Sequence, residues 1–248
     1  MMGYSYMTYA IDGFVILKNA ISKASLDMIH RDLSFLGVEY AKHLSIKLSK
    51  NMTTPEVFSE IEDKNIESFY ELSLSVGDLA SMNNMGLNSP SSDIFQNILS
   101  TYNAPLVATH SAVFFNKINV SRLQYKWHQE KSYFPQHQIG CHIWYPLYND
   151  IKVTGGPMLM KKESHQKVFE YMSWANDKGL TQLEVDESDL EKYETIKCDI
   201  NVGDLVIFDH NMVHCTEPVS DSVVPRIAGI RRFVGNREGI PIACSESK

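Results

Sequence analysis

Short apolar runs separated by turn residues make up the second half of the chain, and this pattern restricts the possible folds more than any other. Turn-forming pairs such as Asn149-Asp150 and Gly155-Gly156 lie between the runs. Many short strands with frequent turns are typical of a β-sandwich or a jelly roll. The runs after Pro105 are residues 112–115, 139–145, 157–160, 205–208 and 226–230.

Helical spacing of apolar residues dominates the chain before Pro105. Residues 13–17 predict one strand, and a helix should follow with Ser22 or Ser25 as its N-cap. Helices that precede strands argue against a βαβ repeat. We therefore predict a mainly β core with a mostly helical N-terminal region. Further helices are expected at residues 55–61, 66–79 and 93–99, the last capped by Ser91 or Ser92, with weaker helical signals at 166–176 and 184–194.

The composition is that of an ordinary globular protein. The 248 residues are 44 % hydrophobic and 21 % charged, without a Pro/Gly/Ser-rich linker. We expect a single domain over residues 1–248, with a strand and helical support at 1–104, a jelly-roll core at 105–235 and a tail at 236–248. The net charge of −7 and the lack of a basic tract argue against nucleic acid as a partner.

The same sequence features predict a cytoplasmic protein without a membrane partner. No apolar stretch approaches the roughly 20 residues of a membrane helix, and residues 1–7 do not resemble a secretory signal. The four cysteines form no CxxC pair, so we expect reduced thiols.

His128 and Glu130 form a candidate pair of metal ligands. They are one residue apart in a segment that looks extended, which would point both side chains to the same side of a strand or strand end. His214, after the apolar run 205–208, is the candidate third ligand. Two histidines and one carboxylate on one face of an ion are the ligands of non-haem Fe(II) oxygenases. Taken alone, the triplet could equally be a surface histidine near a surface glutamate.

Arg226 is a candidate anchor for an anionic ligand. Strand alternation places it on the same face as Ile230 and Arg232. A buried guanidinium needs an anionic partner, and a dicarboxylic cosubstrate could supply one. Arg231 and Arg232 are alternative anchors for the carboxylate. Arg231 would lie on the opposite face of the strand, and Arg232 would lie farther along it. Among competing metal ligands, we regard as weaker His110, His137, His210 and Cys215.

Several of these residues lie in motifs that resemble a known family. Trp127-His128-Gln129-Glu130, followed by Tyr133-Phe134-Pro135, resembles the WHQDxxYxP signature of the phytanoyl-CoA dioxygenase family of Fe(II)/2-oxoglutarate oxygenases. The resemblance continues through most of the chain, with Glu130 in place of the usual aspartate and Glu163 in place of a usual glycine. The other similar segments are residues 12–17, 155–159, 163–165 and 203–208 with His214.

The resemblance implies a double-stranded β-helix with helices packed on its larger sheet. It implies Fe(II) bound by His128, Glu130 and His214, with O2 as the oxidant and ascorbate as a possible reductant. The 2-oxoglutarate cosubstrate would place its distal carboxylate on Arg226, near Thr216 and Trp144. Candidate substrate contacts are Tyr133, Arg232 and His142. His142 shares a strand face with Trp144 and could instead support the ligands from behind.

We therefore expect an enzyme that hydroxylates a small-molecule substrate at an unactivated C–H bond, in a biosynthetic role, and releases succinate and CO2. Desaturation and ring formation stay open, as do the substrate and the oligomeric state. Two other classes remain: a catalytically silent jelly-roll protein that binds a metal or ligand, and a hydroxylase that modifies a partner protein.

Overall fold

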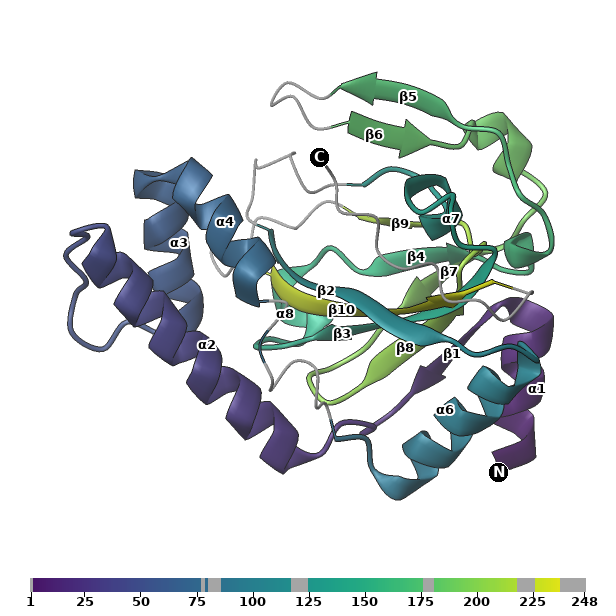
Figure 1. Cartoon of the computed structure of the whole chain (residues 1–248), viewed down its shortest axis with the longest axis horizontal. Helices are drawn as coiled ribbons and strands as arrows, with labels where there is room; N and C mark the ends of the chain where they lie inside the picture. Colours follow the sequence, from purple (N-terminus) through teal and green to yellow (C-terminus); the bar gives the residue numbers. More distant parts are fainter. Residues whose placement is uncertain are drawn as a thin grey trace.

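The computed structural model describes residues 2–76, 79, 86–116, 125–175, 181–217 and 226–236, and its core is a pair of facing sheets (Figure 1). The larger sheet has five strands in the order β1-β8-β3-β10-β2, each antiparallel to its neighbours. Strands distant in sequence are thus neighbours in space. The five strands are β1 (Phe14–Leu17), β8 (Leu205–Asp209), β3 (Ile139–Pro146), β10 (Arg226–Gly235) and β2 (Val107–Asn116).

A smaller sheet faces the large one and closes the jelly roll. Its order is β7-β4-β9, and its strands are β7 (Thr195–Cys198), β4 (Met158–Lys161) and β9 (His214–Thr216). Met158 and Met160 of β4 share one buried cluster with Trp144 and Phe208 of the large sheet. The mainly β, double-stranded β-helix predicted from the sequence is confirmed.

Strand β3 shows why a continuous apolar run was needed at the centre of the large sheet. All its residues are buried, because both faces of the strand are covered. Cys141, Ile143 and Tyr145 belong to the core on the helical side, whereas Trp144 belongs to the core between the sheets. The strand therefore separates the helical layer from the cavity.

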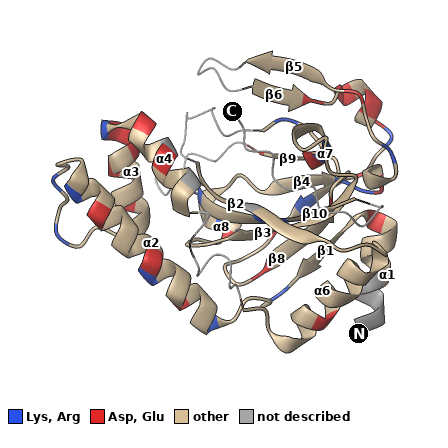
Figure 2. Cartoon of the chain, in the orientation of Figure 1, with Lys and Arg blue, Asp and Glu red and all other residues tan. Residues whose placement is uncertain are grey.

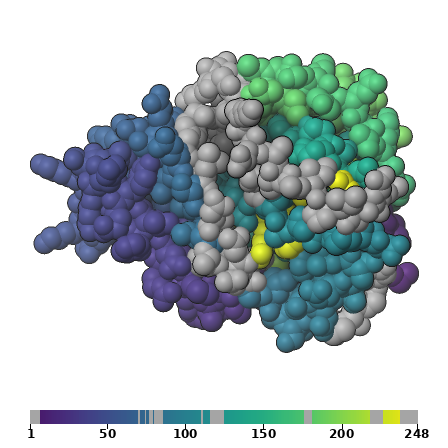
Figure 3. Space-filling view, in the orientation of Figure 1, coloured from purple at the N-terminus to yellow at the C-terminus, as the bar shows by residue number. Residues whose placement is uncertain are grey.

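Five longer helices pack on the outer face of the large sheet (Figure 1). In the space-filling view, the helices within residues 23–76 lie at the left, and residues 172–175 and 181–184, in green, lie at the upper right (Figure 3). Ile29 and Leu33 of α2 contact the same core as Ile207 of β8. The helices are α1 (Met2–Asp12), α2 (Lys23–His43), α3 (Thr54–Lys64), α4 (Ile66–Val76) and α6 (Ser89–Thr101).

The helix starts were predicted with mixed success. Ser22 caps α2 by accepting a hydrogen bond from the Ser25 amide at 3.2 Å, as expected. The cap of α6 is Asn88, which accepts from the Ser91 amide at 3.0 Å, so Ser91 and Ser92 were the wrong residues. Helix α1 was not predicted.

The two weak helical signals at 166–176 and 184–194 were wrong. The first segment contains the end of a 3-10 turn, η2 (Ser164–Gln166), and then β5 (Met172–Ala175), which pairs with β6 (Thr181–Glu184). The second holds only another 3-10 turn, η3 (Glu187–Leu190). The Phe169 amide donates to the side chain of Gln129 at 2.9 Å, and the Val185 amide to the Trp127 carbonyl at 2.8 Å. Contacts with the residues around His128 thus replace helical hydrogen bonds.

Charges of both signs are interspersed along the outer helices (Figure 2). Each helix in the described residues falls short of the length or apolar content needed to traverse a bilayer. Residues 237–248, most of the predicted tail, lie outside the described part of the chain.

Gly229→Ala is expected to destabilise the protein by about 1–3 kcal/mol, the usual cost of overpacking. Gly229 lies opposite Tyr145 in the β10–β3 pairing, and an added Cβ would lie 2.6 Å from the tyrosine ring. Tyr145 is fully buried, so its ring has little room to move. Urea unfolding measures the change. An unchanged midpoint would mean that the ring rotates away at no cost.

Candidate iron and 2-oxoglutarate site

A backbone bridge brings the two histidines together. The amide of each donates to the carbonyl of the other, and both N–O distances are 3.0 Å between His128 and His214. Directly opposed residues of an antiparallel pair project side chains to the same face. Their ring centroids are 4.2 Å apart. The chain thus places two residues separated by most of the jelly roll side by side.

Both imidazoles are oriented by backbone carbonyls. Nδ1 of His128 lies 2.7 Å from the Lys126 carbonyl oxygen, and Nδ1 of His214 lies 3.0 Å from that of Met212. A carbonyl only accepts, so Nδ1 carries the proton and Nε2 keeps a free lone pair. Burial lowers the pKa of His128 and lowers that of His214 to about 3. Both rings are therefore neutral, as metal ligands must be.

Glu130 reaches the histidines from the first residue of a short helix, α7 (Glu130–Tyr133). The expectation of an extended segment holds at His128 and is wrong at Glu130. Gln129 causes the change of direction: its fully buried amide group donates to the carbonyls of Lys167, at 2.8 Å, and Asn211. Tertiary contacts, rather than strand alternation, bring the carboxylate to the site.

The three side chains fit one metal ion. Their ligand atoms lie within 4.8 Å of one another, and all three residues are buried. Glu130 Oε1 and His214 Nε2 are 3.8 Å apart. To form metal–ligand bonds of roughly 2.0–2.2 Å, the three ligand atoms would have to move only slightly closer together. Two neutral imidazoles and a carboxylate on one side of an ion form the set typical of non-haem Fe(II).

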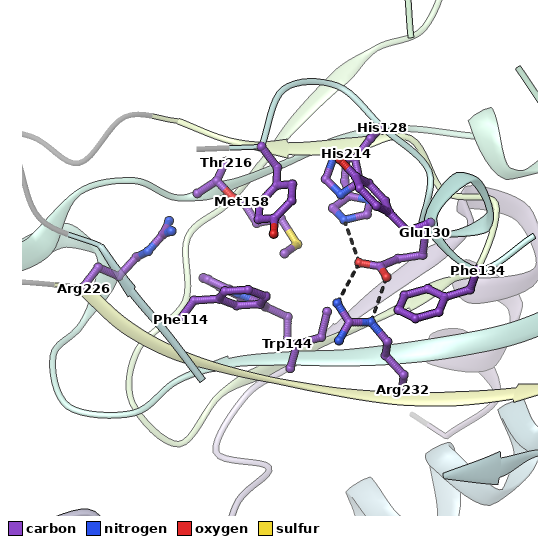
Figure 4. A pocket seen from close by; sticks show the side chains of 13 residues that line it. Phe114, His128, Glu130, Phe134, Trp144, Met158, His214, Thr216, Arg226 and Arg232 are labelled. Carbon is purple, nitrogen blue, oxygen red and sulfur yellow. Dashed lines mark hydrogen bonds and ion pairs between the residues drawn. The ribbon is translucent and has the colours of Figure 1, made fainter. Parts of the chain in front are cut away.

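Arg232 pairs with the carboxylate of Glu130. Its Nε donates to Oε2 at 2.8 Å, and its Nη2 approaches Oε1 at 3.4 Å (Figure 4). Burial raises the pKa of Glu130, but the charge and hydrogen bonding of Arg232, together with His142 and His214 nearby, hold the pKa well below its usual range. The glutamate is therefore ionised and available as a ligand. Arg232, predicted as a substrate contact, lines the same pocket and is engaged with a predicted ligand.

Arg226 lies at the other end of the same pocket, away from the three candidate ligands (Figure 4). The cavity has a volume of about 150 Å³. The Arg226 guanidinium is buried, and it donates through Nη1 to the Gly156 carbonyl, while its Nε has no partner. Burial lowers the pKa of Arg226 to about 10. Within the described residues this arginine forms no ion pair, so it fits the carboxylate of a small anion.

Thr216 and Trp144, both predicted near the cosubstrate, also line this pocket. Thr216 opposes Met158 in the β4–β9 pairing. The indole of Trp144 lies 5.9 Å from the Arg226 guanidinium carbon. The cavity volume of about 150 Å³ is many times the roughly 10–15 Å³ that a single water needs, so the cavity has room for a small ligand.

Of the remaining candidate substrate contacts, Tyr133 lines the pocket and His142 does not. The Tyr133 hydroxyl accepts from the Leu183 amide of β6 at 3.0 Å. His142 is fully buried, and its Nε2 lies 2.9 Å from Nδ1 of His210. His142 therefore lies outside the cavity, beside His210.

The competing ligands are not part of the triad. Among the described residues, the group with metal-ligand geometry consists of His128, Glu130 and His214. His210 pairs with His142, and Cys215 does not line the pocket. The side chain of His110 lies outside the described part of the chain.

Sequence reasoning missed Gln129 and two aromatic residues of the pocket wall, Phe114 and Tyr125. Tyr125 contacts Phe114 and Tyr133 edge to face, with centroids 6.0 and 5.8 Å apart. All three rings line the cavity beside His128. No periodic pattern distinguishes them from ordinary core residues. Gln129 had two signals, its position between two candidate ligands and its place in the Trp127-His128-Gln129-Glu130 motif.

Comparison with known families agrees with this site. The family model for Phytanoyl-CoA dioxygenase (PhyH) matches residues 9–228. The chain belongs to the phytanoyl-CoA dioxygenase family. It is therefore an Fe(II)- and 2-oxoglutarate-dependent oxygenase that uses O2. A comparison with curated protein sequences gives no match.

Solved structures share the fold at low sequence identity. EctD from S. alaskensis, with 2-oxoglutarate and 5-hydroxyectoine, aligns with a TM-score of 0.57 at 14% identity, covering 94% of this chain and 75% of its own. The non-heme α-ketoglutarate-dependent carbocyclase SnoK from nogalamycin biosynthesis has a TM-score of 0.55 at 15% identity, covering 94% and 83%. EvdO2 from Micromonospora carbonacea var. aurantiaca has a TM-score of 0.54 at 16% identity, covering 94% and 90%.

Proposed function

We propose that this oxygenase hydroxylates an unactivated C–H bond of a small-molecule substrate while 2-oxoglutarate is converted to succinate and CO2. One oxygen atom of O2 would enter the substrate hydroxyl and the other the new carboxylate of succinate. The observation that carries the proposal is one pocket with His128, Glu130 and His214 at one end and, at the other, Arg226, which forms no ion pair with a described residue (Figure 4).

Each group of residues has a separate task. His128 and His214 would bind Fe(II) through Nε2, and Glu130 through a carboxylate oxygen. Three protein ligands on one face leave the remaining positions for cosubstrate and oxygen. Fe(II) and 2-oxoglutarate, when bound, supply the O2 activation that no side chain of the chain can provide.

The far end of the pocket would hold and orient the cosubstrate. Arg226 offers an uncompensated buried positive charge and a free Nε donor to the distal carboxylate. The Thr216 hydroxyl would add a hydrogen bond. Trp144, Phe114 and Tyr125 exclude water from the walls, which strengthens these electrostatic contacts.

A cytoplasmic, biosynthetic setting is part of the proposal. Three cysteines, Cys141, Cys198 and Cys215, are free and buried in the described residues. Burial raises the pKa of Cys198 and Cys215 to about 12. Unpaired, inert thiols are typical of proteins from a reducing compartment.

Succinate formation tests the proposed activity. Purified protein is incubated with Fe(II), ascorbate and 2-oxoglutarate, with and without candidate small molecules, and succinate is measured. We expect more succinate than from the His128→Ala variant, because loss of one imidazole leaves an incomplete metal site. Equal succinate from both proteins would contradict the oxygenase activity and favour a silent binding protein.

A further inference from the structure

We infer that Arg232 is a positioning residue for the metal site: it orients the Glu130 carboxylate so that Oε1 is presented to the metal and Oε2 is turned away. The inference rests on the proposed function, in which Glu130 is a ligand. It also assigns Arg232 a role other than binding substrate.

The geometry distinguishes the two carboxylate oxygens. Oε2 of Glu130 is engaged by Arg232 Nε at 2.8 Å, whereas Nη2 is 3.4 Å from Oε1. Oε1 is the oxygen nearer to His214, at 3.8 Å from Nε2. A short charge-assisted bond on one oxygen and a long contact on the other fix the carboxylate plane. The metal would therefore be bound through a single oxygen.

Glu130 needs this restraint more than an aspartate would. The glutamate side chain has an additional methylene and therefore an additional rotatable bond, so it loses more conformational entropy when it is held in one geometry. Arg232 comes from β10, in the middle of the large sheet, opposite His142 of β3. A rigid strand thus supplies the group that fixes the longer ligand, as hydrogen bonds behind ligands do in metal sites generally.

Arg232 is itself held in place. Its residue is 8% exposed, and its guanidinium carbon lies 5.1 Å from the ring centroid of Phe134. A substrate anion would have to displace a buried carboxylate from two guanidinium nitrogens before it could bind. Breaking a buried ion pair is strongly unfavourable, so the pairing with Glu130 is retained during binding.

A double-mutant cycle on metal affinity tests this inference. Mn(II) binding is measured anaerobically by calorimetry for the wild type, Glu130→Asp, Arg232→Met and the double variant. Aspartate cannot reach both Arg232 and the metal position, so Glu130→Asp should weaken binding in the wild-type background. In the Arg232→Met background, Glu130→Asp should weaken Mn(II) binding by a smaller factor. We expect the Mn(II) affinity of the double variant to differ at least about fivefold from the value that additive single effects would give. This is within the range found for contacting residues.

Three control measurements separate positioning from general damage. Arg231→Met removes the neighbouring guanidinium, which does not line the pocket, and should leave Mn(II) affinity unchanged. Arg232→Lys keeps the positive charge but loses the planar guanidinium that donates from two nitrogens. It should therefore recover only part of the Mn(II) affinity. In the metal-free protein, Arg232→Met should lower the thermal midpoint because it leaves a buried unpaired carboxylate. Adding Glu130→Gln, a neutral side chain of the same shape, should restore that midpoint.

The outcomes are distinguishable. Additive effects of Glu130→Asp and Arg232→Met on Mn(II) affinity would overturn the positioning role, as would full recovery of affinity by Arg232→Lys. A wild-type protein that binds no Mn(II), or a Glu130→Gln variant with wild-type affinity, would instead contradict the proposed function, because Glu130 would then not be a ligand.

Discussion

Replacing His214 with alanine is expected to abolish Fe(II) binding and to reduce turnover of 2-oxoglutarate by more than about a hundredfold. Removing a residue that only supports a metal ligand typically lowers metal affinity or activity about 10–100-fold. His214 is a candidate ligand itself, so its removal should have a larger effect. Its loss also removes the imidazole nitrogen that lies 3.8 Å from Glu130 Oε1. Two remaining side chains cannot form a facial triad. Anaerobic calorimetry with Mn(II) and a succinate assay measure the two effects.

The backbone role of His214 should survive the substitution. Its amide and carbonyl make the bridge to His128, and alanine retains both groups, so the variant should remain folded. His43→Ala is a matched control, because His43 is an exposed residue in the last turn of α2. A His214→Ala protein with Mn(II) affinity within about twofold of the wild type would exclude this triad as the metal site.

Replacing Arg226 with methionine is expected to raise the half-saturating concentration of 2-oxoglutarate by roughly 10- to 150-fold. Hydrogen bonds to charged groups contribute about 1.5–3 kcal/mol, and each 1.4 kcal/mol corresponds to about tenfold in affinity. Methionine keeps much of the apolar stem and removes the charge. Turnover at saturating 2-oxoglutarate and Mn(II) affinity should change far less, because Arg226 lies at the opposite end of the pocket from the ligands (Figure 4).

The free energy of unfolding should show that weaker 2-oxoglutarate binding by Arg226→Met does not result from loss of folded protein. Arg226 is a desolvated charge without an ion pair in the described residues. Its removal should therefore leave the free energy of unfolding unchanged or increase it. Arg231→Met, five positions further along β10, is the matched control and should not alter the dependence on 2-oxoglutarate. An unchanged dependence in Arg226→Met would place the carboxylate anchor elsewhere.

Much of the β core follows directly from residue patterns. The apolar run at 139–145 predicted β3, and the run at 205–208 predicted β8, because a strand covered on both faces must be apolar throughout. Alternation along β10 correctly placed Arg226 and Arg232 on the face that lines the pocket. Local rules succeed here because strand periodicity depends on the backbone alone.

The same rules failed where long-range contacts determine the local conformation. The segment 166–176 was expected to be helical. Instead, the Phe169 amide donates a hydrogen bond to the Gln129 side chain, and β5 pairs with β6. From its parity with Trp144, His142 was expected either to support the ligands or to contact substrate; it does not line the pocket, and its partner is His210, on a turn distant in sequence. Neither Gln129 nor His210 carries a local signal of these contacts.

The sequence by itself determined the candidate ligands His128, Glu130 and His214 and the family to which the chain belongs, because those depend on residue types and their order. The tertiary structure alone decided how the ligands meet. The His128–His214 bridge depends on the pairing of distant segments, and the approach of Glu130 depends on a helix start held by Gln129. The partner of Arg232 depends on how β10 packs against that helix. These are properties of register and packing, which no local pattern contains.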